Sequence, residues 1–162
     1  LFRTSGGAAH GKQLGLGHIF RCINLAIELH NCEIFFLIED FGGVKKILQR
    51  RGFKNIKILK PDITSRDDFL VTKSHIEKNK INLIIIDKYK VKFRFVESLS
   101  KIVKTVLISD LKEINYKSHL LINGFIGFNN WSIDFDAFSQ IGNIDDSYNC
   151  FESKINSGNL AS

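Results

Sequence analysis

The chain has 162 residues and a net charge of +6, with 44% hydrophobic and 25% charged residues. This length suits one domain with a single core, and the composition is that of a folded globular protein, which excludes a disordered chain. No apolar run reaches the ~18 residues that a membrane-spanning helix needs, and no signal peptide is visible, so we expect a cytoplasmic protein without a membrane span. Three widely spaced cysteines without a CxxC pair predict reduced thiols and no metal site: Cys22, Cys32 and Cys150.

The positive charge is unevenly distributed along the chain. Residues 129–162 contain five acidic residues and one lysine, so the excess of basic residues lies in residues 1–128. A basic body is typical of proteins that bind anionic partners, such as phosphate-bearing ligands or nucleic acids. The basic residues are scattered and not clustered, which favours the simpler interpretation of a solvated, lysine-rich surface.

Short apolar runs alternate with helical patterns along most of the chain. Continuous apolar runs are typical of parallel strands buried on both faces, whereas apolar residues three and four apart indicate helices. The first run begins at Leu1, in mid-strand and without a Met, so we expect a slightly truncated N-terminus. We expect strands at 1–3, 34–38, 54–59, 83–86, 106–108 and 120–122, and helices near 19–29, 44–48, 69–80 and 93–102.

This alternation predicts an α/β fold. The expected architecture is an open, Rossmann-like parallel sheet of five to seven strands, with right-handed crossovers and helices on both faces. From Gly124 the pattern decays, because aromatic residues mix with Gly, Asn and Asp without a clear period. We therefore expect residues 1–125 to form the domain and residues 126–162 to be a tail or a connection towards a further domain.

The first glycine-rich stretch, "GGAAHGKQ", has the spacing of a phosphate-binding P-loop at Gly6, Gly11 and Lys12. A working P-loop continues with Ser or Thr, which binds the magnesium ion, but here Gln13 follows. The expected helix also starts too far downstream. We therefore reject a nucleoside-triphosphate loop.

The second stretch, "GLGHIFR", joins the first strand to the first helix. Gly15 and Gly17 let the backbone approach a ligand closely, at the carboxyl end of a strand, where open α/β sheets bind ligands. Phe20 occupies the third glycine position of a dinucleotide fingerprint, so that interpretation is weak. The helix dipole favours a neutral imidazole at His18, a candidate general base. Arg21 lies on the same helical face and could bind an anionic group, unless the two residues serve only as a helix cap and a surface ion pair.

Polar residues follow two of the later strands. Asp87 and Tyr89 follow "LIII", and Asp110 follows "VLIS", so all three are expected at the same sheet edge as the glycine loop. An acid at a strand end commonly caps the next helix, which we favour for Asp110. No histidine has a partner at metal-ligand spacing, so no metal site is predicted. We expect the remaining histidines on the surface, namely His10, His30, His75 and His119.

With these residues the sequence resembles a known family, the PseG-type UDP-sugar hydrolases of the pseudaminic acid pathway, which are grouped with spore-coat polysaccharide biosynthesis proteins. The resemblance is to their N-terminal domain and covers roughly residues 1–125. It implies that the chain is the N-terminal half of a two-domain GT-B architecture, with a C-terminal nucleotide-binding domain as its partner and no cofactor. The motifs that carry it are "LFR", "GLGH" followed by Arg21, "LAIEL", "LIIIDKYKV", "LISD" and "LLIN".

The resemblance also implies a reaction in cell-surface glycan biosynthesis. A UDP-2,4-diacetamido-2,4,6-trideoxy-sugar would be hydrolysed with inversion to UDP and the free sugar, and the family's catalytic base matches His18. The chain departs from the family at Ser5, where members often have Asp, and in the longer "TSGGAAHGKQ", so the identity of the sugar stays open. The residues expected to bind this nucleotide-sugar substrate are Gly15, Gly17, Arg21, Asp87 and Tyr89.

Two other functions stay open. "GLGH" is also similar to the glycine-histidine loop of the lipid II-forming transferase, so the chain could be the acceptor domain of a GT-B glycosyltransferase with an exposed apolar patch. A non-catalytic basic α/β module that binds nucleic acid would need a contiguous face of Lys and Arg. The sequence shows neither the signature of a recognition helix nor aromatics interleaved with basic residues, so nucleic acid is not the expected partner.

Overall fold

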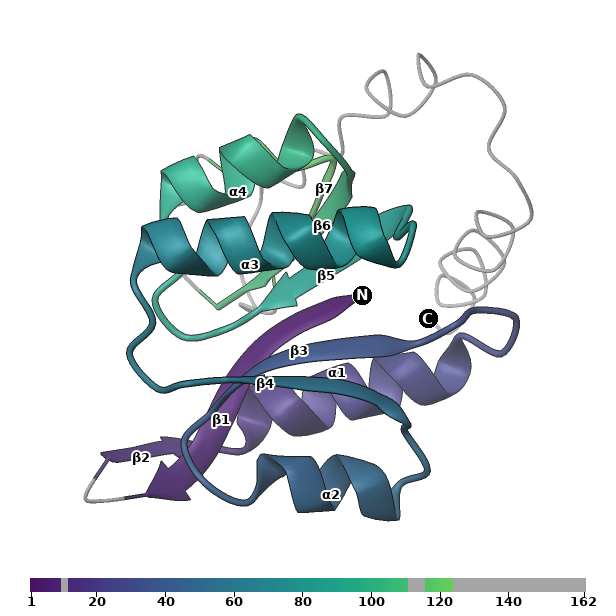
Figure 1. Cartoon of the computed structure of the whole chain (residues 1–162), viewed down its shortest axis with the longest axis vertical. Helices are drawn as coiled ribbons and strands as arrows, with labels where there is room; N and C mark the ends of the chain where they lie inside the picture. Colours follow the sequence, from purple (N-terminus) through teal and green to yellow (C-terminus); the bar gives the residue numbers. More distant parts are fainter. Residues whose placement is uncertain (10–11, 111–115, 124–162) are drawn as a thin grey trace, which may run out of the picture.

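Strands and helices alternate in the order that the apolar runs predict (Figure 1). The computed structural model describes residues 1–9, 12–110 and 116–123. The expectation for residues 126–162 lies outside these described residues. The elements are β1 (Phe2–Ala9), β2 (Lys12–Gly15), α1 (Gly17–Glu28), β3 (Phe35–Asp40), α2 (Val44–Arg50), β4 (Asn55–Leu59), α3 (Ser65–Lys78), β5 (Leu83–Asp87), α4 (Phe93–Ser100), β6 (Lys104–Ser109) and β7 (Leu120–Asn123).

The described strands form one sheet with the order β4-β3-β1-β5-β6-β7, and every neighbouring pair on this path is parallel. The order is Rossmann-like, because the chain builds outwards from β1 to β4 and then crosses back to place β5 on the other side of β1. This reversal creates a switch point between β1 and β5, and ligands of open α/β sheets bind at the carboxyl ends of the strands beside such a point. The predicted fold class is confirmed.

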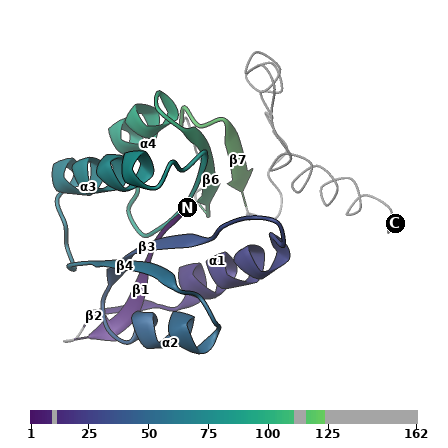
Figure 2. The ribbon, with the colours of Figure 1, turned by 45° about the vertical axis from the view of Figure 1, so that its right-hand side comes forward.

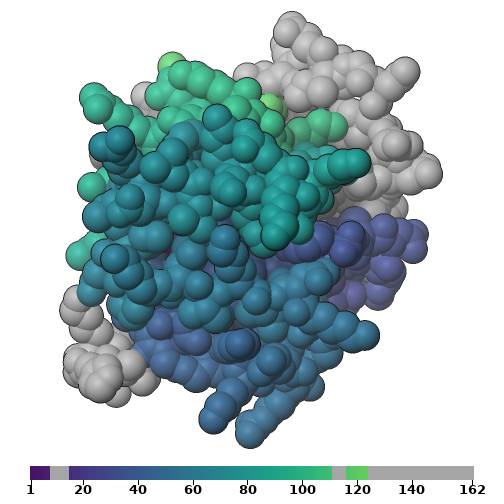
Figure 3. Space-filling model, viewed as in Figure 1, coloured from purple at the N-terminus to yellow at the C-terminus, as the bar shows by residue number. Residues whose placement is uncertain are grey.

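Two helices cover each face of the sheet (Figure 2). Successive strand residues point to opposite faces: Phe36 and Ile38 pack with α1 and α2, whereas Leu37 packs with α3 and α4. Because both faces are covered, β3, β5 and β6 carry apolar residues on both sides, which explains their continuous runs. The space-filling view from the α3 side shows side chains of this helix and its neighbours closing over the sheet (Figure 3).

The glycine-rich stretch "GGAAHGKQ" belongs to a hairpin and not to the loop that we expected. Strand β1 continues to Ala9 and pairs in an antiparallel way with β2, and this hairpin projects from one end of the sheet (Figure 1). Gly7 has φ +114°, and a Cβ added there would lie 2.7 Å from both the backbone nitrogen and the backbone oxygen of Gly42. The glycine therefore permits a close crossing of two backbones, and the P-loop spacing is a coincidence of this hairpin.

None of the helices in the described part of the chain is long and apolar enough to cross a membrane.

Candidate functional site

The predicted site residues lie where α1 begins, beside the switch point. Helix α1 starts at Gly17 directly after β2, so its first turn lies next to the carboxyl ends of β1 and β5. Gly15 has φ +68°, a conformation that favours glycine, and an added Cβ at Gly15 or Gly17 would meet no atom within 4 Å. Gly15 is therefore required by the backbone, whereas Gly17 leaves open space beside His18.

His18 contacts the carboxylate that ends β5. Its Nδ1 lies 2.7 Å from Oδ1 of Asp87, whose side chain is fully buried. Because an ionised carboxylate only accepts hydrogen bonds, we assign the proton to Nδ1, which donates it to Asp87. The lone pair is then on Nε2, which forms no hydrogen bond with the described residues. This pairing of an imidazole with a buried orienting carboxylate is the arrangement that general bases use.

Arg21 holds the same carboxylate from its other side. Its Nε lies 2.7 Å from Oδ2 of Asp87 and its Nη2 lies 2.7 Å from Oδ1, a bidentate pair. Burial alone would raise the pKa of Asp87, but hydrogen bonds from Arg21 and His18 outweigh this effect and hold the pKa below its ordinary value. Asp87 is therefore a carboxylate at neutral pH.

The guanidinium of Arg21 lies between two carboxylates. Besides Asp87, it contacts Asp110, with Nη1 2.8 Å from Oδ1 and Nη2 3.1 Å from Oδ2. The hydrogen bonds to Asp87 raise the pKa of Arg21 above its already high value, so the group stays charged. The sequence left two roles open for Arg21, binding of an anionic group and a surface ion pair, and favoured a helix cap for Asp110. In the structure the two side chains form an ion pair with each other.

A cleft of about 290 Å³ opens beside this cluster. His18 lines it together with Tyr89, which is 49% exposed, so the structure brings these two predicted site residues to the same cleft. Four other predicted residues do not line the cleft: Gly15, Gly17, Arg21 and Asp87. Of these, Arg21 and Asp87 contact His18 directly. The other lining residues come from the segment after β5, the end of β6 and the approach to β7: Lys88, Lys90, Val91, Leu107, Ile108, Ser109, Asp110 and Tyr116.

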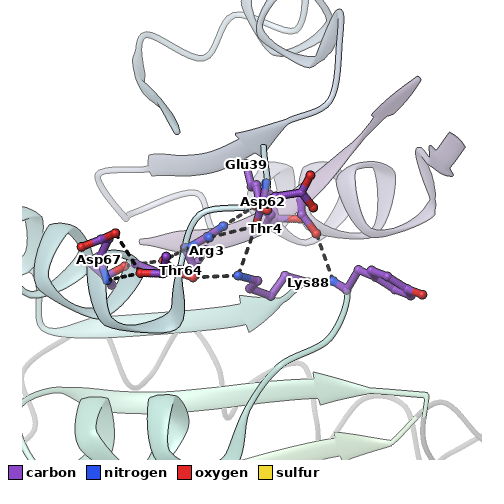
Figure 4. A network of polar contacts seen from close by, with 11 residues as sticks. Arg3, Thr4, Glu39, Asp62, Thr64, Asp67 and Lys88 are labelled. Carbon is purple, nitrogen blue, oxygen red and sulfur yellow. Dashed lines mark hydrogen bonds and ion pairs between the residues drawn. The ribbon is translucent and has the colours of Figure 1, made fainter. Parts of the chain in front are cut away.

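A second charged cluster, which the sequence analysis missed, lies on the α3 side of the sheet (Figure 4). Arg3 in β1 is fully buried and donates two hydrogen bonds of 2.8 Å to Asp68 of α3. Lys88 contacts Asp68 at 2.7 Å and Glu39 at 3.2 Å, so two cations balance two carboxylates. Burial raises the pKa of Asp68, but Arg3 and Lys88 together lower it further than burial raises it. The sequence contains a signal for this cluster, because the charged residues Arg3 and Glu39 directly adjoin apolar strand runs.

The second cluster also fixes the loop that forms the wall of the cleft. Lys88 follows Asp87 directly, and its ion pairs tie the start of this loop to α3. The backbone N–H of Tyr89 donates a 3.0 Å hydrogen bond to Oγ of Ser5. Ser5, the position at which the sequence departs from the resembled family, therefore holds the cleft loop onto β1.

The expectation for the remaining histidines is wrong in two cases. His30 is exposed, but His75 and His119 are half-buried, and burial lowers the pKa of both. His75 packs edge-on against the ring of Phe35, and Nδ1 of His119 accepts a 3.2 Å hydrogen bond from the backbone N–H of Thr105. Within residues 1–9, 12–110 and 116–123, no group of three or more His, Cys, Asp or Glu side chains is arranged to hold a metal ion. His10 lies outside the described residues.

Comparison with known proteins gives a distant relative of unknown activity. The chain is 28% identical over 121 residues to an uncharacterized protein of Methanocaldococcus jannaschii. The match covers 71% of this chain and 23% of the relative, so the chain spans less than a quarter of that protein's length. No family model matches the chain, and no solved structure matches it significantly.

Proposed function

We propose that this chain supplies the catalytic-base half of a GT-B-type nucleotide-sugar hydrolase, in which His18 activates the water that attacks the anomeric carbon. The observation that carries the proposal is the 2.7 Å contact between His18 Nδ1 and the buried carboxylate of Asp87, at the edge of the cleft. The products are UDP and a free sugar of the 2,4-diacetamido-2,4,6-trideoxy type, in line with the resemblance to PseG-type hydrolases.

The arrangement suits general-base chemistry for an electrostatic reason. When Nε2 accepts a proton from water, His18 becomes a cation, and the Asp87 carboxylate beneath it stabilises that charge. Asp87 also fixes the proton on Nδ1, so that Nε2 is available as the base. Arg21 in turn keeps Asp87 ionised and immobile through its bidentate contact. In this proposal Arg21 and Asp87 position the base, and they do not bind the sugar.

The cleft can hold the reacting part of the substrate. Its volume of about 290 Å³ lies near the lower limit of small-molecule sites, which suits a single sugar unit better than a whole nucleotide-sugar. Tyr89 offers a half-exposed ring and a hydroxyl for contact with the sugar. A second domain facing this edge would then hold the nucleotide, as the resemblance to the GT-B architecture implies.

The test is the His18→Asn variant of the full-length enzyme that contains this chain. A positioned general base contributes about 10²–10⁴-fold in rate, so kcat should fall by that factor while KM and the fold change little. His30→Asn is the matched control, because His30 is exposed just beyond the end of α1 and far along the helix from the cleft. UDP release per folded molecule is the measurement. Turnover of His18→Asn within threefold of the His30→Asn control would refute the role of His18 as a base.

A further inference from the structure

Basic and aromatic side chains alternate on the surface after β5. Within residues 89–94, which we call the 89–94 surface, Lys90, Lys92 and Arg94 follow one another at every second position and are all exposed. Tyr89 and Phe93 lie between and beside them and are 49% and 51% exposed. In the part of the chain that the structure describes, none of these three cations forms an ion pair. The expectation that aromatics are not interleaved with basic residues is therefore wrong at "YKVKFR", which forms an exposed basic surface without ion pairs to the described residues.

The rings of Phe93 and Tyr116 form an aromatic stack that is exposed on the side of Phe93. The Phe93 ring lies on Tyr116 with the ring centroids 4.5 Å apart and the planes 20° from parallel. Tyr116 is itself held, because its hydroxyl donates a 2.9 Å hydrogen bond to the backbone oxygen of Val91. Since Tyr116 covers one face of Phe93 and half of Phe93 is exposed, the stack can be extended by a third flat ring.

The turn that carries the first cation is rigidly held. Lys90 has φ +53°, an uncommon backbone conformation for a residue other than glycine. The turn is anchored by the hydrogen bond from Tyr89 to Ser5 and by the ion pair of Lys88 with Asp68. Nζ of Lys90 lies 5.0 Å from the centroid of the Tyr89 ring. The cation therefore occupies a fixed place beside the ring of Tyr89, and no carboxylate of the described residues pairs with it.

We propose that the 89–94 surface binds a ligand that combines a nucleobase with phosphate groups. The base stacks on the open face of Phe93, and the phosphates contact Lys90, Lys92 and Arg94. Two sources share this chemistry, a free nucleotide and a single-stranded nucleic acid. A membrane surface fits less well, because Phe93 is held flat against Tyr116 and does not project as an inserting side chain. The proposal does not depend on the chemistry of His18.

The test measures binding of two probes to the 162-residue chain: fluorescently labelled oligothymidylate by anisotropy, and UDP by calorimetry. Phe93→Leu removes the flat ring but keeps an apolar side chain, and it should weaken binding by about 5- to 100-fold, as loss of one base–aromatic stack does. Phe93→Tyr should restore it. Replacing the three cations by Gln should reduce the salt dependence of oligonucleotide binding by a slope of about 2. The matched control removes three exposed cations from α2, on the opposite face of the sheet, by Lys45→Gln, Lys46→Gln and Arg50→Gln.

The results separate the two sources. Tighter binding of oligothymidylate than of UDP indicates a single-stranded nucleic acid, whereas equal affinities indicate a free nucleotide; both support the proposal if Phe93→Leu weakens them. The proposal is overturned if neither probe binds, if Phe93→Leu binds as the wild type does, or if the α2 control weakens binding as much as the triple variant. Capture by anionic phosphatidylglycerol vesicles without nucleotide binding also overturns it. Because the assay needs no sugar substrate, its failure leaves the proposed hydrolase untouched.

Discussion

Replacing Asp87 by asparagine removes one charge from the centre of the His18 cluster while keeping the shape of the side chain. In the wild type the two carboxylate oxygens accept hydrogen bonds from Nδ1 of His18 and from two nitrogens of Arg21. An asparagine has one acceptor oxygen and one NH₂ donor. Because Arg21 contacts both oxygens of Asp87, either orientation of the amide sets its NH₂ against one Arg21 nitrogen. We expect the orientation that keeps the oxygen on Nε of Arg21, in which the NH₂ faces His18 and Nδ1 becomes the acceptor.

The expected loss of stability follows from burial. Removing one partner of a fully buried ion pair typically costs about 3–5 kcal/mol, because it leaves an uncompensated charge. The side chain of Arg21 is 35% exposed and keeps Asp110 as a partner, so solvent and the remaining carboxylate reduce this cost. We expect Asp87→Asn to lower the free energy of unfolding by about 1–3 kcal/mol.

The pH dependence of this loss of stability shows whether the carboxylate of Asp87 is its cause. Because the folded-state pKa of Asp87 is held below its unfolded value of about 3.9, the stabilisation is complete above that value and is lost as the pH falls through the folded pKa. The difference in unfolding free energy between wild type and Asp87→Asn should therefore shrink as the pH falls below about 4, where Asp87 takes up its proton. Urea unfolding of both chains over this range measures it.

The effect of Asp87→Asn on the imidazole of His18 can be measured without a substrate. In the wild-type chain, ¹⁵N NMR of His18 should show the proton on Nδ1, and Asp87→Asn should shift it towards Nε2. In the full-length enzyme the same variant should lower kcat by about 10²–10⁴-fold with little change in KM, since a wrong tautomer disables the base. Asp110→Asn is the control for the NMR measurement, because it removes an exposed partner of Arg21 and leaves the contact between His18 and Asp87. An unchanged tautomer in Asp87→Asn, or the same tautomer shift in both variants, would refute the reasoning.

Two further substitutions test the fold around the site by urea unfolding. Gly7→Ala should lower the free energy of unfolding by about 1–3 kcal/mol, because its Cβ would meet the backbone of Gly42 at a positive φ. Its control, Gly17→Ala, meets no atom and should be nearly neutral, so equal effects would contradict the close crossing. Lys88→Met should lower the free energy of unfolding by about 2–4 kcal/mol, because it leaves the α3-side carboxylates with one cation. The exposed control Lys73→Met should lower it by less than about 0.5 kcal/mol, and a loss that small for Lys88→Met would show that the cluster is not coupled to stability.

The order of the elements could be predicted because it depends on local patterns. Strands β3 and β5 are covered on both faces, so residues 35–38 and 83–86 form unbroken apolar runs, and the helices carry a single apolar face. The hairpin of β1 and β2 could not be predicted in the same way. Its residues are glycine-rich and polar, and the need for Gly7 arises from a contact with Gly42, which is distant in the sequence.

The sequence predicted the residues that line the cleft, but not the ion pairs behind them. Position at the carboxyl edge of the sheet sufficed to select His18 and Tyr89, and the structure brings both to the cleft. The partners of Arg21 could not be found from spacing, because Asp87 and Asp110 lie 66 and 89 residues away from it along the chain. In the folded chain Arg21, for which ligand binding was one expected role, is held between the carboxylates of Asp87 and Asp110.

Asp87 and Lys88 show how the sheet positions the cleft loop from both faces. They are neighbours in the chain, yet Asp87 contacts side chains of α1 and Lys88 contacts Asp68 of α3. The end of β5 is thereby held by one charged cluster on each side of the sheet, and the next residue, Tyr89, is tied to β1 through Ser5. A catalytic or binding group acts well only when its support allows little movement, about 0.5 Å. Asp87, Lys88 and Tyr89 are each held by a separate contact, and together these contacts restrict the movement of the loop at the switch point.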